Sequence, residues 1–186
     1  MANERSLAVG VSFLGYGTPG DGVAAAEFKQ CPIIEEGTVV FNFNDPTSVD
    51  FRAEGMKDPW ESFDKAGDAD SFEFGIPSPT PEEMKEFMGG EVKDGKWNAP
   101  VDIPIIRKSM KITTLPYKDK QTEYIFALCK ISAKISRAPS SEQTDLMLVR
   151  CTKLTPVSAA GKQGSPFSRA VKDVTSESQT VSETEK

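Results

Sequence analysis

Few residues of this chain could carry out chemistry, because the sequence contains no histidine. Histidine is the side chain most often used for proton transfer near neutral pH, and it is the commonest transition-metal ligand. A Ser-His-Asp or Cys-His mechanism within the chain is therefore excluded. Cys31, Cys129 and Cys151 form no Cys-x-x-Cys pair, and their odd number favours reduced thiols in a cytosolic product.

A literal G-x-G-x-x-G pattern spans Gly15, Gly17 and Gly20 after a predicted strand. A dinucleotide-binding fold would need a full helix beginning at this point and a parallel strand after it. Pro19 interrupts the helix start, and Pro32 closes the segment soon afterwards. The pattern therefore indicates a flexible glycine-rich loop.

The remaining candidates for chemistry are carboxylates. Asp64, Asp68 and Asp70 lack the Asp-x-Asp-x-Asp-Gly spacing of a calcium loop, so a solvated loop is favoured. Glu82 and Glu83 could form an acid–base pair, but their place at a helix N-terminus is explained by capping and the helix dipole. We therefore expect no catalytic residue, no metal site, no cofactor and no enzymatic activity.

The elements that would position these residues are mostly strands. In 48–54, Val49 and Phe51 alternate with Asp50 and Arg52, so one face is expected toward a core and the other toward water or a partner. Strands are expected at 7–14, 37–44, 48–54, 71–76, 101–106, 109–115, 123–137 and 144–154, and a helical turn at 23–30.

One short helix, at about 80–89, interrupts the strands. Thr80 and Glu83 form a Thr-x-x-Glu capping box, and the Gly-Gly pair after Met88 is typical of a helix stop. So short a helix is not stable alone in water, so its apolar stripe must pack against a sheet. That stripe consists of Met84, Phe87 and Met88.

The strand at 123–137 is long and changes character along its length. One face stays apolar throughout, whereas the other changes from Tyr124 and Phe126 to alternating lysine and serine. Such a strand leaves a two-sided core and continues as a half-exposed ribbon. The polar positions are candidates for a lumen or an inter-subunit face, with an ordinary solvent-facing strand as the alternative: Lys130, Ser132, Lys134 and Ser136.

Two polar segments complete the chain. Residues 55–70 are expected to form a long loop whose Trp60 and Phe63 either make a contact site or fold back onto the core. Residues 158–186 are rich in Ser, Thr, Glu and Gly, which favours a polar, flexible C-terminal tail after a β-rich domain at 1–157.

Charge is distributed unevenly along the sequence. Residues 1–100 hold 8 Lys+Arg against 19 Asp+Glu, whereas 101–157 hold 10 against 5. An acidic half beside a basic half suits head-to-tail association of copies, and an ordinary mixed surface is the alternative. No basic, aromatic-interleaved patch indicates tight nucleic-acid binding, and no apolar run of about 18 residues predicts a membrane span.

In the order and spacing of these elements, residues 1–157 resemble the tail tube (major tail) proteins of tailed phages and phage-like particles. The resemblance rests on GTVVFNFN and SVDFRAEG at the β-rich start, and on SFEFGIPSPTPEEMKEFMGGEV, a strand leading into a short helix. It also rests on the paired long strands EYIFALCKISAKISRA and TDLMLVRCTKLTPV.

The resemblance implies a mainly β fold, an antiparallel β-sandwich or barrel with one packed helix. It also implies self-assembly into rings, expected to be hexameric, that stack into a hollow tube for genome passage. The expected partners are further copies, other tail proteins and DNA that passes without specific binding. The expected location is the virion tail, assembled in the host cytoplasm.

Two alternatives stay open. One is another ring-forming virion protein, such as a connector, terminator or decoration protein. The other is a soluble β-barrel that binds a small ligand, since a fold alone does not fix a function.

Overall fold

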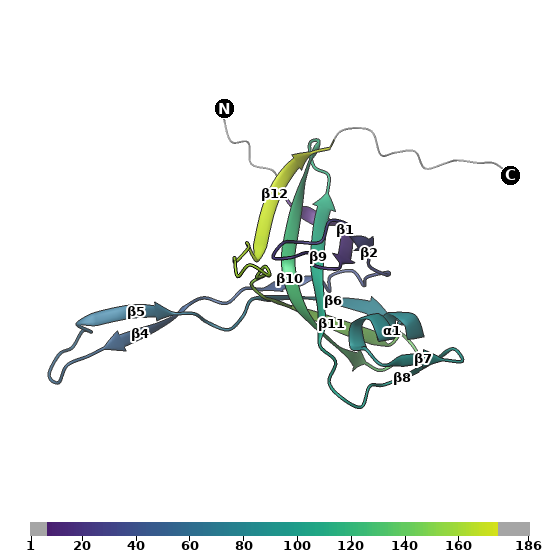
Figure 1. The fold of residues 1–186 in the computed structure, drawn as a ribbon, viewed down its shortest axis with the longest axis horizontal. Coiled ribbons are helices and arrows are strands. Elements are labelled where there is room, and N and C mark those ends of the chain that lie inside the picture. The colour runs from purple at the N-terminus through teal and green to yellow at the C-terminus, as the bar shows by residue number, and fades with distance from the viewer. Residues whose placement is uncertain (1–6, 175–186) are drawn as a thin grey trace. The chain divides into compact units, whose positions relative to one another are not determined.

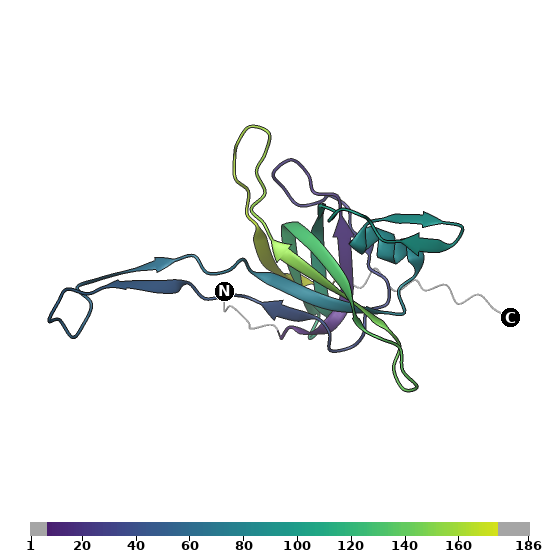
Figure 2. The same cartoon turned by 90° about the horizontal axis from the view of Figure 1, so that it is seen from below.

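The computed structural model describes residues 7–174 and confirms the expected fold class. The chain is mainly β, with 49% strand and 5% helix, and its sheets are antiparallel, consistent with a β-sandwich. The described residues, drawn as a ribbon in Figures 1 and 2, divide into two units. Unit 1 comprises 7–31, 107–129 and 155–174, and unit 2 comprises 32–106 and 130–154.

Unit 1 is an antiparallel sheet with a well-buried apolar face. Its strands follow the order β2 (Lys29–Gln30), β1 (Val9–Gly17), β9 (Ile106–Leu115) and the first part of β10 (Lys120–Arg137), and β12 (Phe167–Asp173) also pairs with β10. The side chains that form its core are Leu14, Tyr16, Met110, Ile112 and Phe126.

Unit 2 has a central pair of buried strands. The second part of β10 is followed in sheet order by β11 (Leu146–Lys153), β6 (Ser71–Pro77) and β3 (Val40–Asn42). Phe72, Phe74 and Ile76 of β6 are buried, as their alternation predicted. The remaining elements are α1 (Pro81–Met88) and two hairpins, β4 (Thr47–Phe51) with β5 (Glu61–Lys65) and β7 (Glu91–Lys93) with β8 (Lys96–Asn98).

The long strand β10 shows the predicted change of character. Its first part is buried or half-buried on both faces, with Phe126 and Cys129 fully enclosed. Beyond Ile131 the strand becomes mostly exposed. A two-sided core that continues as a half-exposed ribbon is therefore confirmed.

Two expected elements are absent from their places. Residues 23–30 form no helical turn, because the N–H of Ala25 donates to Ser109 Oγ (2.9 Å) instead of to a local carbonyl. The expected strand at 101–106 is a loop apart from Ile106, since Pro100 and Pro104 have no N–H to donate to a neighbouring strand.

Two segments expected to be irregular contain strands. Within 55–70, residues 61–65 form β5, and within 158–186, residues 167–173 form β12. The expectation of a flexible tail is therefore wrong for β12, while residues 175–186 lie outside the described part of the chain. The backbone of β12 pairs along its whole length with Lys120–Phe126 of β10. Backbone pairing does not require apolar side chains, so a polar segment can form this strand.

Candidate interaction surface

No group of three or more metal-ligating side chains occurs within residues 7–174. Asp64 lies on β5, whereas Asp70 accepts a hydrogen bond from Lys153 Nζ. Together with the N–H of Asn44, that hydrogen bond holds the pKa of Asp70 below its usual value. Of the three aspartates, Asp70 thus serves the local fold, whereas Asp64 and Asp68 are exposed.

The three cysteines are structural. All three are buried and form no disulfide, and Cys129 and Cys151 lie inside strands as predicted. Burial raises the pKa of Cys129 to about 12, and it raises that of Cys31 despite the opposing charge of Lys108. Neither thiol is a nucleophile at neutral pH.

The glycine pattern at 15–20 has a structural role, and the expectation of a flexible loop is wrong for its first part. Gly15 and Gly17 lie within β1, and the next element along the chain is the strand β2, not a helix. A side chain at Gly17 would meet the carbonyl oxygen of Glu27 at 2.3 Å, so the glycine permits a close backbone approach.

The helix α1 adopts the predicted caps and the predicted packing. Thr80 Oγ1 accepts from the N–H of Glu83 (3.3 Å), and Glu83 Oε2 accepts from the N–H of Thr80 (2.8 Å). Of the apolar stripe, Phe87 is 1% exposed and meets Phe74 edge-on at 6.0 Å, while Met84 and Met88 are half-buried. The stripe belongs to the core of unit 2.

The four polar positions of β10 are all exposed. Lys130, Ser132, Lys134 and Ser136 share one face of the strand in unit 2. Ser136 Oγ donates to the carbonyl of Leu146 (3.3 Å), so it also supports the β10–β11 pair. The arrangement offers a row of two positive charges and two hydroxyl groups.

Trp60 and Phe63 belong to a hydrogen-bonded ribbon, which we call the arm: residues 47–65, containing β4 and β5. In the register of this pair, Val49 lies opposite Phe63 and Phe51 lies opposite Glu61. The rings of Phe51 and Phe63 stack at 5.7 Å, and the ring of Trp60 lies 6.5 Å from that of Phe51. These four side chains form the arm's apolar face.

The opposite side of the arm is a self-contained polar face made of Ser48, Asp50, Ser62 and Asp64. Ser62 Oγ donates to Asp50 Oδ1 (2.7 Å) and lies 2.9 Å from Ser48 Oγ. The alternation predicted for 48–54 is therefore present along β4, but the expectation that its apolar face points toward a core is wrong. The reason is that β4 and β5 pair only with each other and form a separate two-stranded sheet.

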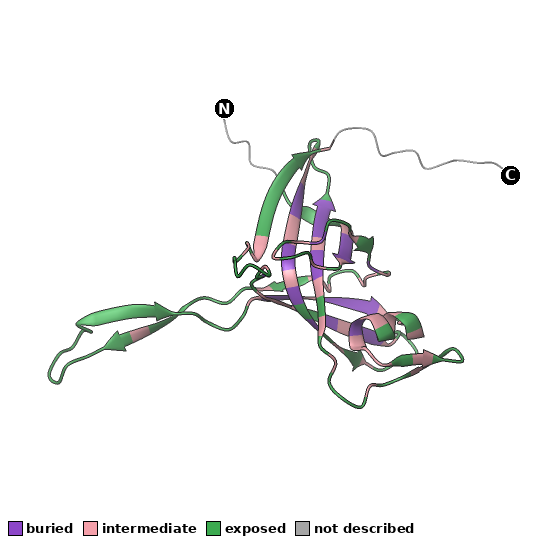
Figure 3. Cartoon of the chain, viewed as in Figure 1, coloured by how far each residue is buried: buried purple, intermediate pink, exposed green. Residues whose placement is uncertain are grey.

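The apolar face is open to solvent along the arm. Residues 50–69 are all exposed, Trp60 by 64% and Phe63 by 50%. Figure 3 shows the arm in green over nearly its whole length. The alternative in which both aromatic side chains fold back onto the core is therefore wrong.

The base of the arm is firmly tied to unit 2. Asp70 accepts from the N–H of Asn44 (3.0 Å) and from Lys153 Nζ, while the N–H of Lys153 donates to the carbonyl of Asp70 (2.7 Å). The amide of Asn44 donates to the carbonyl of Asp68 (3.3 Å). The segment that leads into the arm and the segment that leads out of it are thus joined to each other and to β11.

A second exposed apolar segment lies in the loop before β9. Val101, Ile103 and Ile105 alternate with Asp102 and Pro104, and Ile103 is 93% exposed. Pro104 is half-buried beside Gly89, whose Cβ position would lie 2.9 Å from the Pro104 ring. We call these three exposed side chains the ridge. The alternation in this segment predicts a strand, but the structure has an exposed loop here instead.

In unit 1, a nearly buried carboxylate joins three strands. Glu123 of β10 pairs with Lys111 of β9 (2.7 Å) and with Lys172 of β12 (2.6 Å). Burial alone would raise the pKa of Glu123, but the hydrogen bonds and charges of the two lysines outweigh it and lower the pKa. The ion pairs therefore help to fix β12 on β10.

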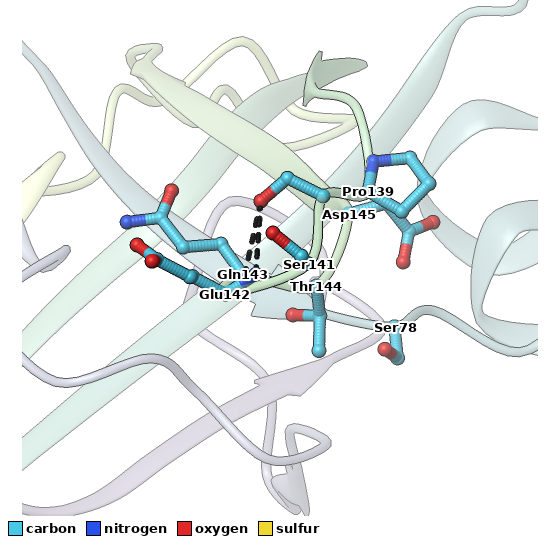
Figure 4. Close-up of a pocket in the computed structure, with 8 residues that line it drawn as sticks. Ser78, Pro139, Ser141, Glu142, Gln143, Thr144 and Asp145 are labelled. Atoms are coloured by element: carbon cyan, nitrogen blue, oxygen red, sulfur yellow. Dashed lines mark hydrogen bonds between the residues drawn. The ribbon is translucent and has the colours of Figure 1, made fainter.

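A shallow hollow of about 420 Å³ lies beside the β10–β11 turn (Figure 4). Ser140 Oγ accepts from the N–H groups of Glu142 (3.4 Å) and Gln143 (3.1 Å), which closes the turn on itself. Its lining is largely polar and open, whereas small-molecule sites are mostly apolar and enclosed. This hollow gives no support to a ligand-binding site.

The comparisons with known proteins identify no relative. No protein-family profile matches the chain, and no curated protein matches its sequence. Within residues 7–174, no helix is long or apolar enough to cross a membrane.

Proposed function

We propose that this chain is a structural virion protein, a tail tube subunit that assembles with copies of itself into stacked rings. The observation that carries the proposal is the arm, an ordered ribbon with an apolar face open to solvent. A large exposed apolar patch on an ordered element is typical of a protein–protein contact site. The sequence resemblance supplies the kind of assembly.

The ridge supports the same proposal from another part of unit 2. Val101, Ile103 and Ile105 are exposed within one short loop, where they contribute nothing to the core. A subunit in a ring needs at least two different contact surfaces, one for each neighbour. The arm and the ridge provide two.

The distribution of charge also suits repeated contacts between copies. Residues 43–70, which contain the arm, hold 3 Lys+Arg and 8 Asp+Glu, whereas 101–157 hold 10 and 5. Opposite charges on different surfaces guide copies into one register and suppress wrong contacts. In this proposal the exposed row Lys130, Ser132, Lys134 and Ser136 faces the lumen or a neighbour, other tail proteins bind at the tube ends, and DNA passes without specific binding.

The proposal is tested by negative-stain electron microscopy and size-exclusion chromatography of the purified chain at increasing concentration. We expect rings or tubes in the wild type. Trp60→Ser on the arm and Ile103→Asp on the ridge should abolish them without lowering the thermal stability of the monomer, because both side chains lie outside the core. Asp102→Ala, beside the ridge, is the matched control and should assemble normally.

Other outcomes favour the alternatives. Closed rings that never stack would indicate a connector, terminator or decoration protein. A species that stays monomeric at high concentration and binds a small apolar probe would contradict the tube proposal and favour a ligand-binding barrel.

A further inference from the structure

The apolar face of the arm has a charge pattern that matches itself. On β5 the side chains of this face are Glu61, Phe63 and Lys65, in that order. Phe63 therefore lies midway between a negative and a positive charge on one strand. Glu61 and Lys65 are both exposed.

We propose that two copies of this chain associate through their arms, apolar face against apolar face, about a two-fold axis. The axis lies midway between the two faces and runs perpendicular to the strands. It passes over the Val49–Phe63 pair of each copy, along the direction that joins these two residues. This inference goes beyond the proposed function, because it concerns the chain before it enters a ring.

The symmetry places matching groups opposite one another. A two-fold axis through Phe63 reverses the direction of β5, so Glu61 of one copy lies over Lys65 of the other, and Lys65 lies over Glu61. Phe63 then meets Phe63, and Val49 meets Val49. Each charge thus finds its opposite, and the central apolar side chains are removed from water. A contact that uses the same patch on both copies needs this self-complementarity.

Other features of the arm favour a second copy as the occupant. The polar face is satisfied by its own hydrogen bonds between Ser48, Asp50 and Ser62, so it needs no partner. The base is held by Asp70, which leaves the ribbon ordered before contact. Packed sheets lie about 10 Å apart, a separation that Glu and Lys side chains can bridge together.

The contact is small, so the dimer is weak. It involves about six side chains per copy, against about 20–30 residues on each side of a standard interface. We expect a dissociation constant of about tens of micromolar. The free chain would then keep its apolar face covered at high concentration and release it for assembly.

The test is sedimentation velocity of the full chain over a dilution series, using charge reversals. At concentrations below those at which rings or tubes appear, the wild type should show a monomer–dimer equilibrium. Glu61→Lys places two lysine pairs in the contact, and Lys65→Glu places two glutamate pairs there. Each single reversal should weaken the dimer about tenfold. The double variant Glu61→Lys/Lys65→Glu should restore the wild-type affinity, because both pairs are inverted together.

Mixing provides a second measurement on the same variants. Glu61→Lys carries two positive charges on the face and Lys65→Glu carries two negative ones. An equimolar mixture should therefore form a heterodimer that is tighter than the homodimer of either variant. Asp64→Lys reverses a charge on the polar face of the same strand and should leave the dimer unchanged. Circular dichroism of each variant should match the wild type.

Several results would overturn the proposal. A wild type that remains monomeric to several hundred micromolar, a double variant as weak as the single ones, or a mixture that does not associate each contradicts two-fold pairing of the arms. Open-ended growth with no dimer at any lower concentration would indicate that the arm contacts a different surface of the next copy, and it would also overturn the two-fold pairing. Rings or tubes in the microscope are scored separately, so failure of the dimer leaves the proposed function untouched.

Discussion

Removing the ring of Phe87 should destabilise unit 2 more than the truncation to alanine of any other side chain in α1. Phe87 is 1% exposed and meets Phe74 edge-on, with ring centroids 6.0 Å apart. Phe→Ala in a core typically costs about 3–5 kcal/mol. About 0.5–1.5 kcal/mol of such a loss is the specific ring–ring contribution. We therefore expect Phe87→Ala to lower the free energy of unfolding by about 4 kcal/mol.

Such a loss is large against the total stability of a domain, which is about 5–15 kcal/mol. The helix has eight residues and cannot persist in water without its tertiary contact. Phe87→Asp should therefore prevent soluble folding altogether, because it would bury a charge without a partner. Phe87→Ala should still fold, and it is the variant suited to measurement.

The assay is urea unfolding followed by circular dichroism, with Lys85→Ala as the control. Lys85 lies in the same helix but its side chain is exposed, so its removal should change stability by less than about 0.5 kcal/mol. Equal effects of Phe87→Ala and Lys85→Ala would refute the packing of the stripe. A smaller urea dependence in Phe87→Ala would instead show that α1 detaches separately from the rest of unit 2.

Three further changes test the caps and ion pairs. Thr80→Ala removes the N-cap acceptor and should cost about 1 kcal/mol in thermal unfolding; no change would contradict the capping box. Glu123→Gln leaves the partly buried Lys111 without its counter-charge and should cost about 1–2 kcal/mol, measured by urea unfolding. Asp70 has a lowered pKa, so its contribution is present above its unfolded pKa and is lost as the pH falls through its folded pKa. Asp70→Asn should therefore be less stable than wild type at neutral pH and approach it as the pH falls through the folded pKa of Asp70; a constant difference would contradict the ion pair with Lys153.

The helix was predictable because its signals are local. Thr80, Glu83 and the Gly89–Gly90 pair lie within one short segment, and each acts on backbone groups a few residues away. Alternation also located the buried strand β6, because large apolar side chains at every second position indicate a buried face. Those side chains are Phe72, Phe74 and Ile76, and all three are buried. Local chemistry and burial are the two properties that a sequence displays without knowledge of the partner.

The structures of the arm, the ridge and β12 depend on which other segments pack or pair with them, and the sequence does not show this. Alternation in 48–54 indicated an amphipathic strand, but the identity of its neighbour determines whether the apolar side is covered. The strand β12 is held chiefly by backbone pairing with β10, by the ring of Phe167 against Phe126 (4.8 Å) and by Lys172 with Glu123. Only one of its side chains is a large aromatic, so its composition suggested a flexible tail.

The asymmetry between the two faces of the arm distinguishes a contact surface from an ordinary exposed loop. A two-stranded ribbon alone is marginally stable in water, so an arm without function would gain little from a row of aromatic side chains. Here the polar face is satisfied internally and the base is fixed by Asp70, while Phe51, Trp60 and Phe63 are left open to solvent. Covering these rings would add the apolar burial that the ribbon lacks. Order in the arm and association between copies should therefore reinforce each other.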